Sequence, residues 1–147
     1  MRIINDFEKT ESFLAGKLVG AQLDSFRVHS LELQLNFLGE SVDGLQSYWL
    51  CMTGDVRLSD GESVYHDRAQ VIAGLYALIG QKISAVKIED ESALSLCCEG
   101  KVITISTDDE SLEVVWSFTP ELPDPHVDHS WSVTLTDESE LVMSMAD

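Results

Sequence analysis

The stretch DRAQVIAGLYALIGQKISAVKIE, residues 67–89, changes its hydrophobic period from that of a helix to that of a strand. In its first part, apolar side chains recur at helical spacing: Val71, Ile72, Leu75, Leu78 and Ile79. Asp67 is a preferred N-cap residue, and Gly80 is a common residue at a helix end. The sequence therefore predicts one central helix over about residues 68–79, followed by a strand over residues 83–89.

A second, shorter helix is expected near the start of the chain. Asn5 and Glu8 have the spacing of a capping box, in which each side chain hydrogen-bonds to the backbone N–H of the other residue. Gly16 then provides a helix-ending residue. These signals predict a helix over roughly residues 6–15.

Most of the remaining chain alternates between apolar and polar residues, which is typical of half-buried strands. Two expected strands carry core residues at every second position: Leu31, Leu33, Leu35 and Phe37 in one, and Leu112, Val114, Trp116 and Phe118 in the other. The tail is expected to form a hairpin with apolar residues facing each other: Trp131, Val133 and Leu135 opposite Leu141, Met143 and Met145. Strands thus dominate the expected structure.

The two halves of the chain are faintly similar. GKLVGA at 16–21 resembles GQKISA at 80–85, and SLEL at 30–33 resembles ALSL at 93–96 after a gap of one residue. Such self-similarity indicates an internal duplication, although chance similarity between strand segments is an alternative explanation.

The expected fold is a single α+β domain over residues 1–147, dominated by sheet. A duplication over about 16–60 and 80–118 would give two four-stranded antiparallel units joined by the central helix. Together these units would form a curved sheet or a partly open barrel, with the short N-terminal helix and the C-terminal hairpin added at its ends.

The composition is that of a globular protein, with 44% hydrophobic and 24% charged residues in a chain of 147. Charged residues between Asp6 and Glu11 interrupt the start of the chain, where a signal peptide would be apolar. No apolar run approaches the roughly 20 residues of a membrane-spanning helix. We therefore expect a cytoplasmic protein, whose odd number of cysteines (Cys51, Cys97 and Cys98) remain reduced and mostly buried.

Charge is distributed unevenly along the chain. The net charge is −17, from 26 acidic and 9 basic residues, and Lys101 is the only basic residue after Lys87. Such a field repels nucleic acid and anionic membranes and attracts a cationic protein, unless the acidity serves solubility only. Seven acidic residues and two aromatic anchors are the candidate partner-binding residues: Asp108, Asp109, Glu110, Glu113, Glu121, Asp124 and Asp128, with Trp131 and Tyr48.

Signatures of catalysis are few. The chain has no Gly-x-Ser-x-Gly elbow and no Walker phosphate loop, so we expect no enzyme and no cofactor. PDPHVDHSW, residues 123–131, contains His126 and His129, which are residue types that bind transition metals. Pro123 and Pro125 argue against the helix that would place both histidines on one face. A metal-dependent hydrolase is the alternative to an exposed acidic loop.

The segments GKLVGAQLD, LELQLNF, YWLCM, LIGQKISAVKIE, LSLCCEGKVITIS and LEVVWSF resemble a family of small uncharacterised bacterial proteins. In that family a Gly-led strand, an L-x-L-x-F strand and a helix ending in Leu-x-Gly precede a second sheet segment. This second segment closes on a Glu-x-x-Trp element, here Glu113 to Trp116. The resemblance covers roughly residues 16–118.

Some proteins of this kind are similar to immunity proteins encoded beside polymorphic or contact-dependent growth inhibition toxins. The resemblance therefore implies an immunity protein that binds a basic, nuclease-like toxin and neutralises it by occluding its active surface. The alternative is a non-enzymatic accessory domain that binds a small ligand or another protein, with its acidity serving solubility alone.

Overall fold

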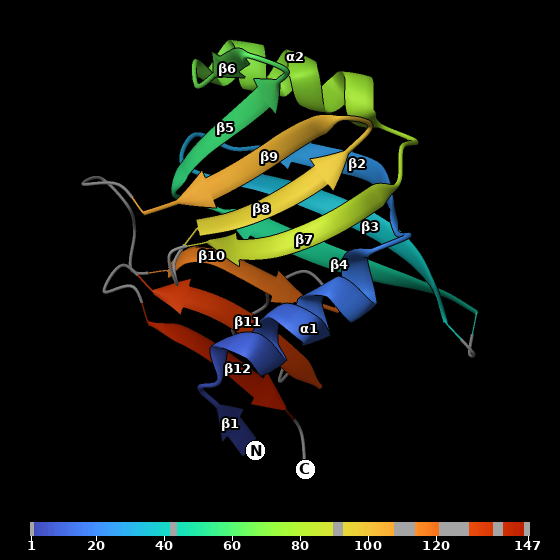
Figure 1. Ribbon diagram of the computed structural model, residues 1–147, viewed down its shortest axis with the longest axis vertical. Helices are drawn as coiled ribbons and strands as arrows, with labels where there is room; N and C mark the ends of the chain where they lie inside the picture. Colours follow the sequence, from blue (N-terminus) through green and yellow to red (C-terminus); the bar gives the residue numbers. More distant parts are fainter. Residues whose placement is uncertain are drawn as a thin grey trace.

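The computed structural model describes residues 2–41, 44–89, 93–107, 114–120, 130–136 and 140–145, which form two antiparallel sheets and two helices (Figure 1). The large, seven-stranded sheet contains, in spatial order, β1 (Arg2–Ile4), β12 (Leu141–Met145), β11 (Trp131–Thr136), β10 (Val114–Thr119), β4 (Gly44–Met52), β3 (Leu33–Ser41) and β2 (Gln22–Val28). The small, five-stranded sheet contains β6 (Ser63–Tyr65), β5 (Asp55–Asp60), β9 (Lys101–Ser106), β8 (Ala93–Cys98) and β7 (Ile83–Glu89). The helices are α1 (Phe7–Leu18) and α2 (Arg68–Leu78).

The two halves of the chain repeat the same order of elements. Helix α1 is followed by the antiparallel strands β2, β3 and β4, and α2 is followed by β7, β8 and β9. The next strand of each half then leaves its own sheet, because β5 pairs with β9 and β10 pairs with β4. Each sheet is therefore built from three strands of one half, extended by strands of the other.

The turns that end the two helices meet and match each other. Gly20 and Gly80 both have positive φ, at 87° and 91°, which glycine adopts without strain. The N–H of Gly20 donates to the carbonyl of Ile83 at 2.8 Å, and the N–H of Gly80 donates to the carbonyl of Leu23 at 2.7 Å. These reciprocal hydrogen bonds place Gly20 and Gly80 in equivalent positions.

This equivalence corrects the register of the predicted repeat. Residues 16–21 end α1, whereas residues 80–85 begin β7, so the predicted match between them is wrong. The mismatch arises because both segments contain a glycine before an apolar stretch, although only Gly20 and Gly80 follow a helix. A duplication over 16–60 and 80–118 stays a prediction about the origin of the repeated topology.

The sheet-dominated α+β class is confirmed, but the units differ from those expected. The chain before α2 contributes β1–β4 to the large sheet and β5 and β6 to the small one. The chain after α2 contributes β7–β9 to the small sheet and β10–β12 to the large one, so there are no separate four-stranded units. Among the described strands, β1 and β2 form the edges of the large sheet and β6 and β7 those of the small one. The sheets are therefore not closed into a barrel.

Both predicted helices are confirmed, with a different cap on the first. Asp6, and not Asn5, is the N-cap of α1, since its side chain accepts the N–H of Lys9 at 3.0 Å. The helix also passes the exposed Gly16 and ends at Leu18. Asp67 caps α2 as predicted, accepting the N–H of Gln70 at 3.3 Å.

The predicted division of the strands into buried and exposed faces is confirmed except near the starts of two strands. Leu31 is 66% exposed because it lies in the turn before β3, while Leu33, Leu35 and Phe37 are buried as expected. A β-bulge between Val114 and Trp116 shifts the alternation in β10, so that Val115 is buried and Val114 is exposed. Leu112 lies outside the described residues.

The C-terminal hairpin is confirmed in its register. The predicted apolar residues of β11 and β12 stand opposite one another: Trp131 with Met145, Val133 with Met143, and Leu135 with Leu141. The three residues on β11 are buried. The hairpin therefore uses its apolar face to extend the core of the large sheet.

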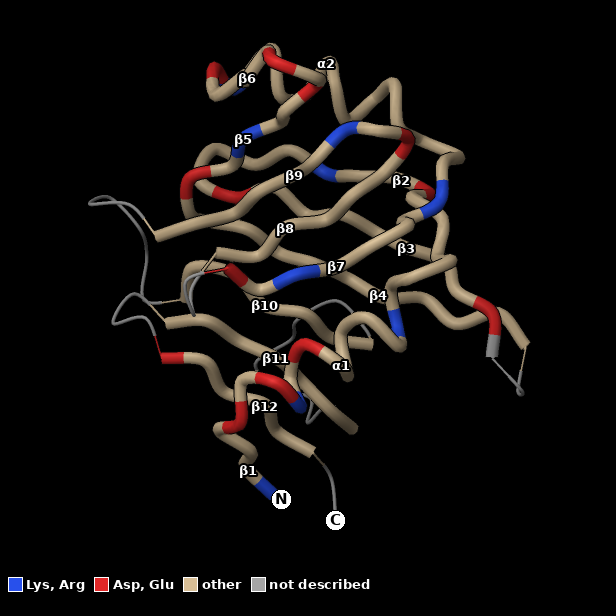
Figure 2. Tube along the Cα trace, in the orientation of Figure 1, with Lys and Arg blue, Asp and Glu red and all other residues tan. Residues whose placement is uncertain are grey.

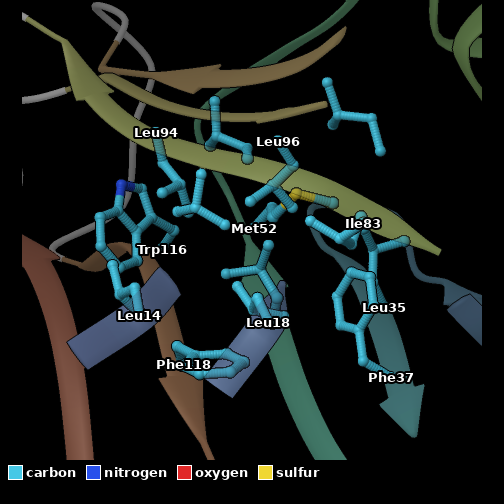
Figure 3. Packing of buried hydrophobic residues seen from close by; sticks show 14 of the residues in the cluster. Leu14, Leu18, Leu35, Phe37, Met52, Ile83, Leu94, Leu96, Trp116 and Phe118 are labelled. Atoms are coloured by element: carbon cyan, nitrogen blue, oxygen red, sulfur yellow. The ribbon is translucent and has the colours of Figure 1, made fainter. Parts of the chain in front are cut away.

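The core lies between the sheets and continues under α1 (Figure 3). Leu94 and Leu96 of the small sheet face Met52 of the large sheet, and Leu14 and Leu18 of α1 lie close to the buried Trp116 and Phe118: all are less than 2% exposed. All three cysteines are free, with Cys51 and Cys98 buried and Cys97 half-buried. Within the part of the chain described, neither helix is long and apolar enough to cross a membrane.

Candidate functional site

Several strand ends gather at one end of the molecule, at the left of Figure 1. β4 ends and β5 begins there, so we call it the β4–β5 end. The strand register places six further strand ends beside them: the ends of β7, β9 and β11 and the starts of β8, β10 and β12. In sequence, the segments that join these strands, 90–92, 108–113 and 137–139, contain eight acidic residues and no basic ones: Asp90, Glu91, Asp108, Asp109, Glu110, Glu113, Asp137 and Glu138.

The acidic residues predicted to bind a partner lie outside the described residues: Asp108, Asp109, Glu110, Glu113, Glu121, Asp124 and Asp128. His126 and His129 lie outside them as well. The surface formed by these side chains therefore stays a prediction. Within the described ranges, no group of three or more His, Cys, Asp and Glu side chains could hold a metal ion.

The two predicted aromatic anchors, Tyr48 and Trp131, belong to a buried aromatic cluster. The ring centroids of Phe118 and Trp131 lie 5.2 Å apart, and Tyr48 lies 5.7 Å from Phe118 and 5.9 Å from Trp131. The ammonium of Lys17 lies over Tyr48 and Trp131, 5.9 and 5.6 Å from their centroids, and over Phe13. Because Tyr48 is 4% and Trp131 9% exposed, these rings offer a partner little surface.

A groove of about 280 Å³ opens at the β4–β5 end, beside the start of α2. Apolar side chains from four elements or their ends line it: Leu33, Met52, Val56 and Val71. The exposed Leu31 also lines it, together with polar residues that include Asp55, His66 and Arg68. The accessible apolar surface of the groove comes from Leu31 and the half-buried Val56, while Leu33, Met52 and Val71 lie buried behind it.

The link between β4 and β5 fixes one wall of this groove. The N–H groups of Thr53 and Gly54 donate to the carbonyl of Val115 at 2.8 and 3.1 Å, and the Thr53 hydroxyl donates to the carbonyl of Val114. A Cβ on Gly54 would lie 2.3 Å from the carbonyl oxygen of Ser106, so this close approach requires glycine. The strand ends that border segment 108–113, at Ser106 and Val114, are therefore held directly beside the groove.

Hydrogen bonds also hold the rim in place. The Asp55 carboxylate accepts from the Arg57 guanidinium at 2.7 Å. Arg68 at the start of α2 donates to the carbonyl of His29 and, at 3.5 Å, to that of Glu32. These contacts attach α2 to the turn between β2 and β3, which carries Leu31.

The thiol of Cys51 lies near this end, on the opposite face of β4 from Met52. Burial, followed by the negative charge of Glu32, raises the pKa of Cys51 from 9.0 to about 12. A thiol with such a pKa is protonated at neutral pH and is a poor nucleophile. Cys51 therefore has the properties of a structural residue.

Sequence reasoning did not predict the groove. Its lining comes from the β2–β3 turn, the β4–β5 link and α2, which are far apart in the chain. One signal was present, because Leu31 continues the apolar alternation of β3 beyond the strand. Only the structure shows that this residue is exposed beside a concave surface.

Comparison with known proteins gives no match: no family model, no curated protein and no solved structure corresponds to this chain.

Proposed function

We propose that this protein is an immunity protein that binds a basic, nuclease-like toxin and neutralises it by covering its active surface. The observation that carries the proposal is an excess of acidic residues that the chain cannot neutralise internally. The chain has 26 acidic and 9 basic residues, so its carboxylates outnumber its Lys and Arg side chains by 17.

The nine basic residues all lie in the described part of the chain, where Lys and Arg are spread singly among Asp and Glu (Figure 2). Arg57 pairs with Asp55 at 2.7 Å, and Lys101 lies 4.0 Å from Asp60. Lys17 and Arg27 instead lie over aromatic rings, with Arg27 5.0 Å from the centroid of Trp49. Several cations are therefore already engaged, which supports a surplus of negative charge for an external partner.

The β4–β5 end is the part of the molecule best suited to this partner. Three segments joining strands at this end contain acidic residues without a basic one, as described above. A cationic protein approaching such a field associates faster than the neutral range of about 10⁵ to 10⁶ M⁻¹s⁻¹. Inhibition would follow from occlusion, since no catalytic motif was recognised in the sequence.

Co-expression with the product of the neighbouring gene tests this proposal. We expect that product to be toxic when expressed alone, harmless when expressed with this protein, and retained with it through purification. A neighbouring product that is neither toxic nor bound would overturn the proposed function.

A second candidate function is that of a non-enzymatic accessory domain that binds a small ligand or another protein, with its acidity serving solubility only. Its binding site would be the groove, whose volume of about 280 Å³ is slightly below the roughly 300–1,000 Å³ of typical small-molecule sites. A metal-dependent hydrolase using His126 and His129 is the third candidate. Metal analysis of protein prepared without a His tag checks it, since a lack of stoichiometric metal would eliminate a resident metal centre.

A further inference from the structure

We propose that the groove beside α2 receives one apolar side chain of the cationic partner, and that Leu31 at its rim contacts the same side chain. This inference rests on the proposed function and specifies how the partner is held. The groove anchors the bound partner, and the acidic segments 90–92, 108–113 and 137–139 attract it over longer distances. Such a division is common in interfaces, where a few buried side chains provide most of the affinity.

The repeated topology provides an internal comparison for the groove. Val56 pairs with Ile105 of β9, and Trp116 pairs with Met52 of β4. Met52 lies opposite Leu33 at the start of β3, and Ile105 lies opposite Leu94 near the start of β8, so Met52 and Ile105 occupy matching positions in the two three-stranded units. Their partners, Trp116 in β10 and Val56 in β5, are therefore equivalent as well.

The two equivalent positions are filled very differently. Trp116 is completely buried and fills part of the core against the large sheet. The smaller Val56 is half-buried and lines the groove. The groove therefore lies where the other half of the molecule holds a large aromatic side chain. An apolar group supplied by a partner can occupy this space and contact Val56.

Helix α2 cannot close the groove by moving toward the sheet. A Cβ on Gly74 would lie 2.0 Å from Cδ2 of Leu58, which shows that the helix already contacts β5 through this glycine. Arg68 also ties the start of the helix to the β2–β3 turn. Because these contacts fix both walls, the groove is preformed and binding a side chain requires little rearrangement.

Leu31 adds apolar surface next to the groove. It is 66% exposed, and its neighbours Leu33 and Met52 are buried at 4% and 1%. Contact between a partner and this exposed leucine would be energetically favourable, because it removes apolar surface from water.

Charge complementarity decides between the occupants of this groove. The chain has a net charge of −17. Thr53 and Gly54, which line the groove, are hydrogen-bonded to the start of β10, and the acidic segment 108–113 immediately precedes β10 in the sequence. An anionic ligand would approach against this field. Of the charged side chains that line the groove, Asp55 is paired with Arg57, and Arg68 is held by the backbone carbonyls of His29 and Glu32. The net negative charge of the whole chain therefore favours an apolar side chain flanked by Lys or Arg.

The first experiment examines the groove without the toxin. Methyl-labelled protein is titrated with N-acetyl-leucinamide and, as a control, N-acetyl-glycinamide, and chemical shifts are followed by NMR. We expect weak binding of the leucine derivative that shifts the methyl groups of Leu33, Met52, Val56 and Val71 and disappears in Val56→Phe. Equal responses to both amides, or no response at these methyl groups, would overturn the assignment of the groove.

The second experiment uses the toxic product of the neighbouring gene and a matched pair of leucines. Leu31 and Leu45 are 66% and 69% exposed. Leu45 lies at the start of β4, opposite Glu40 of β3, and therefore at the end of these strands that is far from the groove. We expect Leu31→Ser to weaken binding by roughly tenfold, mainly through faster dissociation, and Leu45→Ser to change it by less than about twofold. Equal effects of the two substitutions would overturn the role of Leu31.

The two experiments separate the failure of this inference from that of the proposed function. If the leucine derivative occupies the groove but no neighbouring product binds the wild-type protein, the toxin is excluded as the occupant and the proposed function fails. If the toxin binds the wild type and Leu31→Ser equally well, the proposed function stands and the anchoring groove is wrong.

Discussion

Gly74 and Gly16 show how the same residue type has opposite consequences in two helices. Both lie within helices, where alanine is intrinsically preferred by about 1 kcal/mol. At Gly74 a Cβ would lie 2.0 Å from Cδ2 of Leu58, whereas at Gly16 no atom lies within 4 Å. Packing therefore determines the outcome at Gly74, and helix propensity determines it at Gly16.

We predict that Gly74→Ala lowers the free energy of unfolding by about 1–3 kcal/mol, because overpacking outweighs helix propensity. Gly16→Ala is expected to raise it by about 0.5–1 kcal/mol. Urea unfolding of both variants measures these changes. Stabilisation by Gly74→Ala would contradict the close contact between α2 and β5.

Cys51 leads to a prediction about alkaline pH. The folded state raises the pKa of this thiol from 9.0 to about 12, first through burial and then through Glu32. Between these values the unfolded chain releases the thiol proton and the folded chain keeps it. The stability associated with Cys51 is therefore complete below pH 9 and is lost as the pH rises toward about 12.

Urea unfolding near pH 8 and near pH 10.5 should show a larger loss of stability for the wild type than for Cys51→Ser. Serine does not titrate in this range, and the other titrating groups are common to both proteins. An identical loss in both proteins would show that the thiol is not shielded in the folded state.

Helix α1 protects an edge of the small sheet. Its Glu11 carboxylate accepts the N–H of Ile88 in the edge strand β7 at 2.9 Å. Exposed edge strands are prone to pairing with other chains, so this contact both positions the helix and occupies a free donor.

We expect Glu11→Ala to lower the free energy of unfolding by about 1.5–3 kcal/mol and to accelerate amide exchange at Ile88. Glu11→Gln keeps an acceptor oxygen and should cost less. Hydrogen exchange followed by NMR measures the local effect. Unchanged protection of Ile88 in Glu11→Ala would contradict the role of this hydrogen bond.

Elements with strong local signals could be predicted from the sequence. The spacing of Leu75 and Leu78 with the Asp67 cap defined α2, and the alternation from Trp131 to Leu135 defined the register of the hairpin. The cap of α1 was misplaced because Asn5 and Asp6 are both favourable cap residues. The bulge in β10 could not be predicted, since a run of apolar residues fits either register.

The exchange of β5 and β10 between the two sheets could not be predicted from the sequence. Both strands have the pattern of ordinary meander strands, and their partners β9 and β4 are distant in the chain. The groove depends on this exchange, because Val56 lies on β5 and lines it beside α2. The candidate partner-binding charge, by contrast, was evident from the sequence, although its residues lie outside the described ranges.

Association with the toxin should depend on where the carboxylates lie as well as on their number. The variant Asp108→Asn/Asp109→Asn/Glu110→Gln removes three charges from the segment that follows β9 in the sequence. Its matched control, Asp24→Asn/Glu40→Gln/Glu99→Gln, removes three exposed charges elsewhere, near the opposite ends of the strands. Both variants change the net charge equally, so only position distinguishes them.

The association rate constant with the neighbouring gene product, measured by stopped flow at increasing salt, tests whether the acidic residues of this chain attract the partner. We predict a steep fall with salt for the wild type, and a rate roughly tenfold lower for the 108–110 variant, with a smaller decrease for the control. An association rate that does not depend on salt, or that falls equally in both variants, would contradict electrostatic attraction of the partner by segment 108–113.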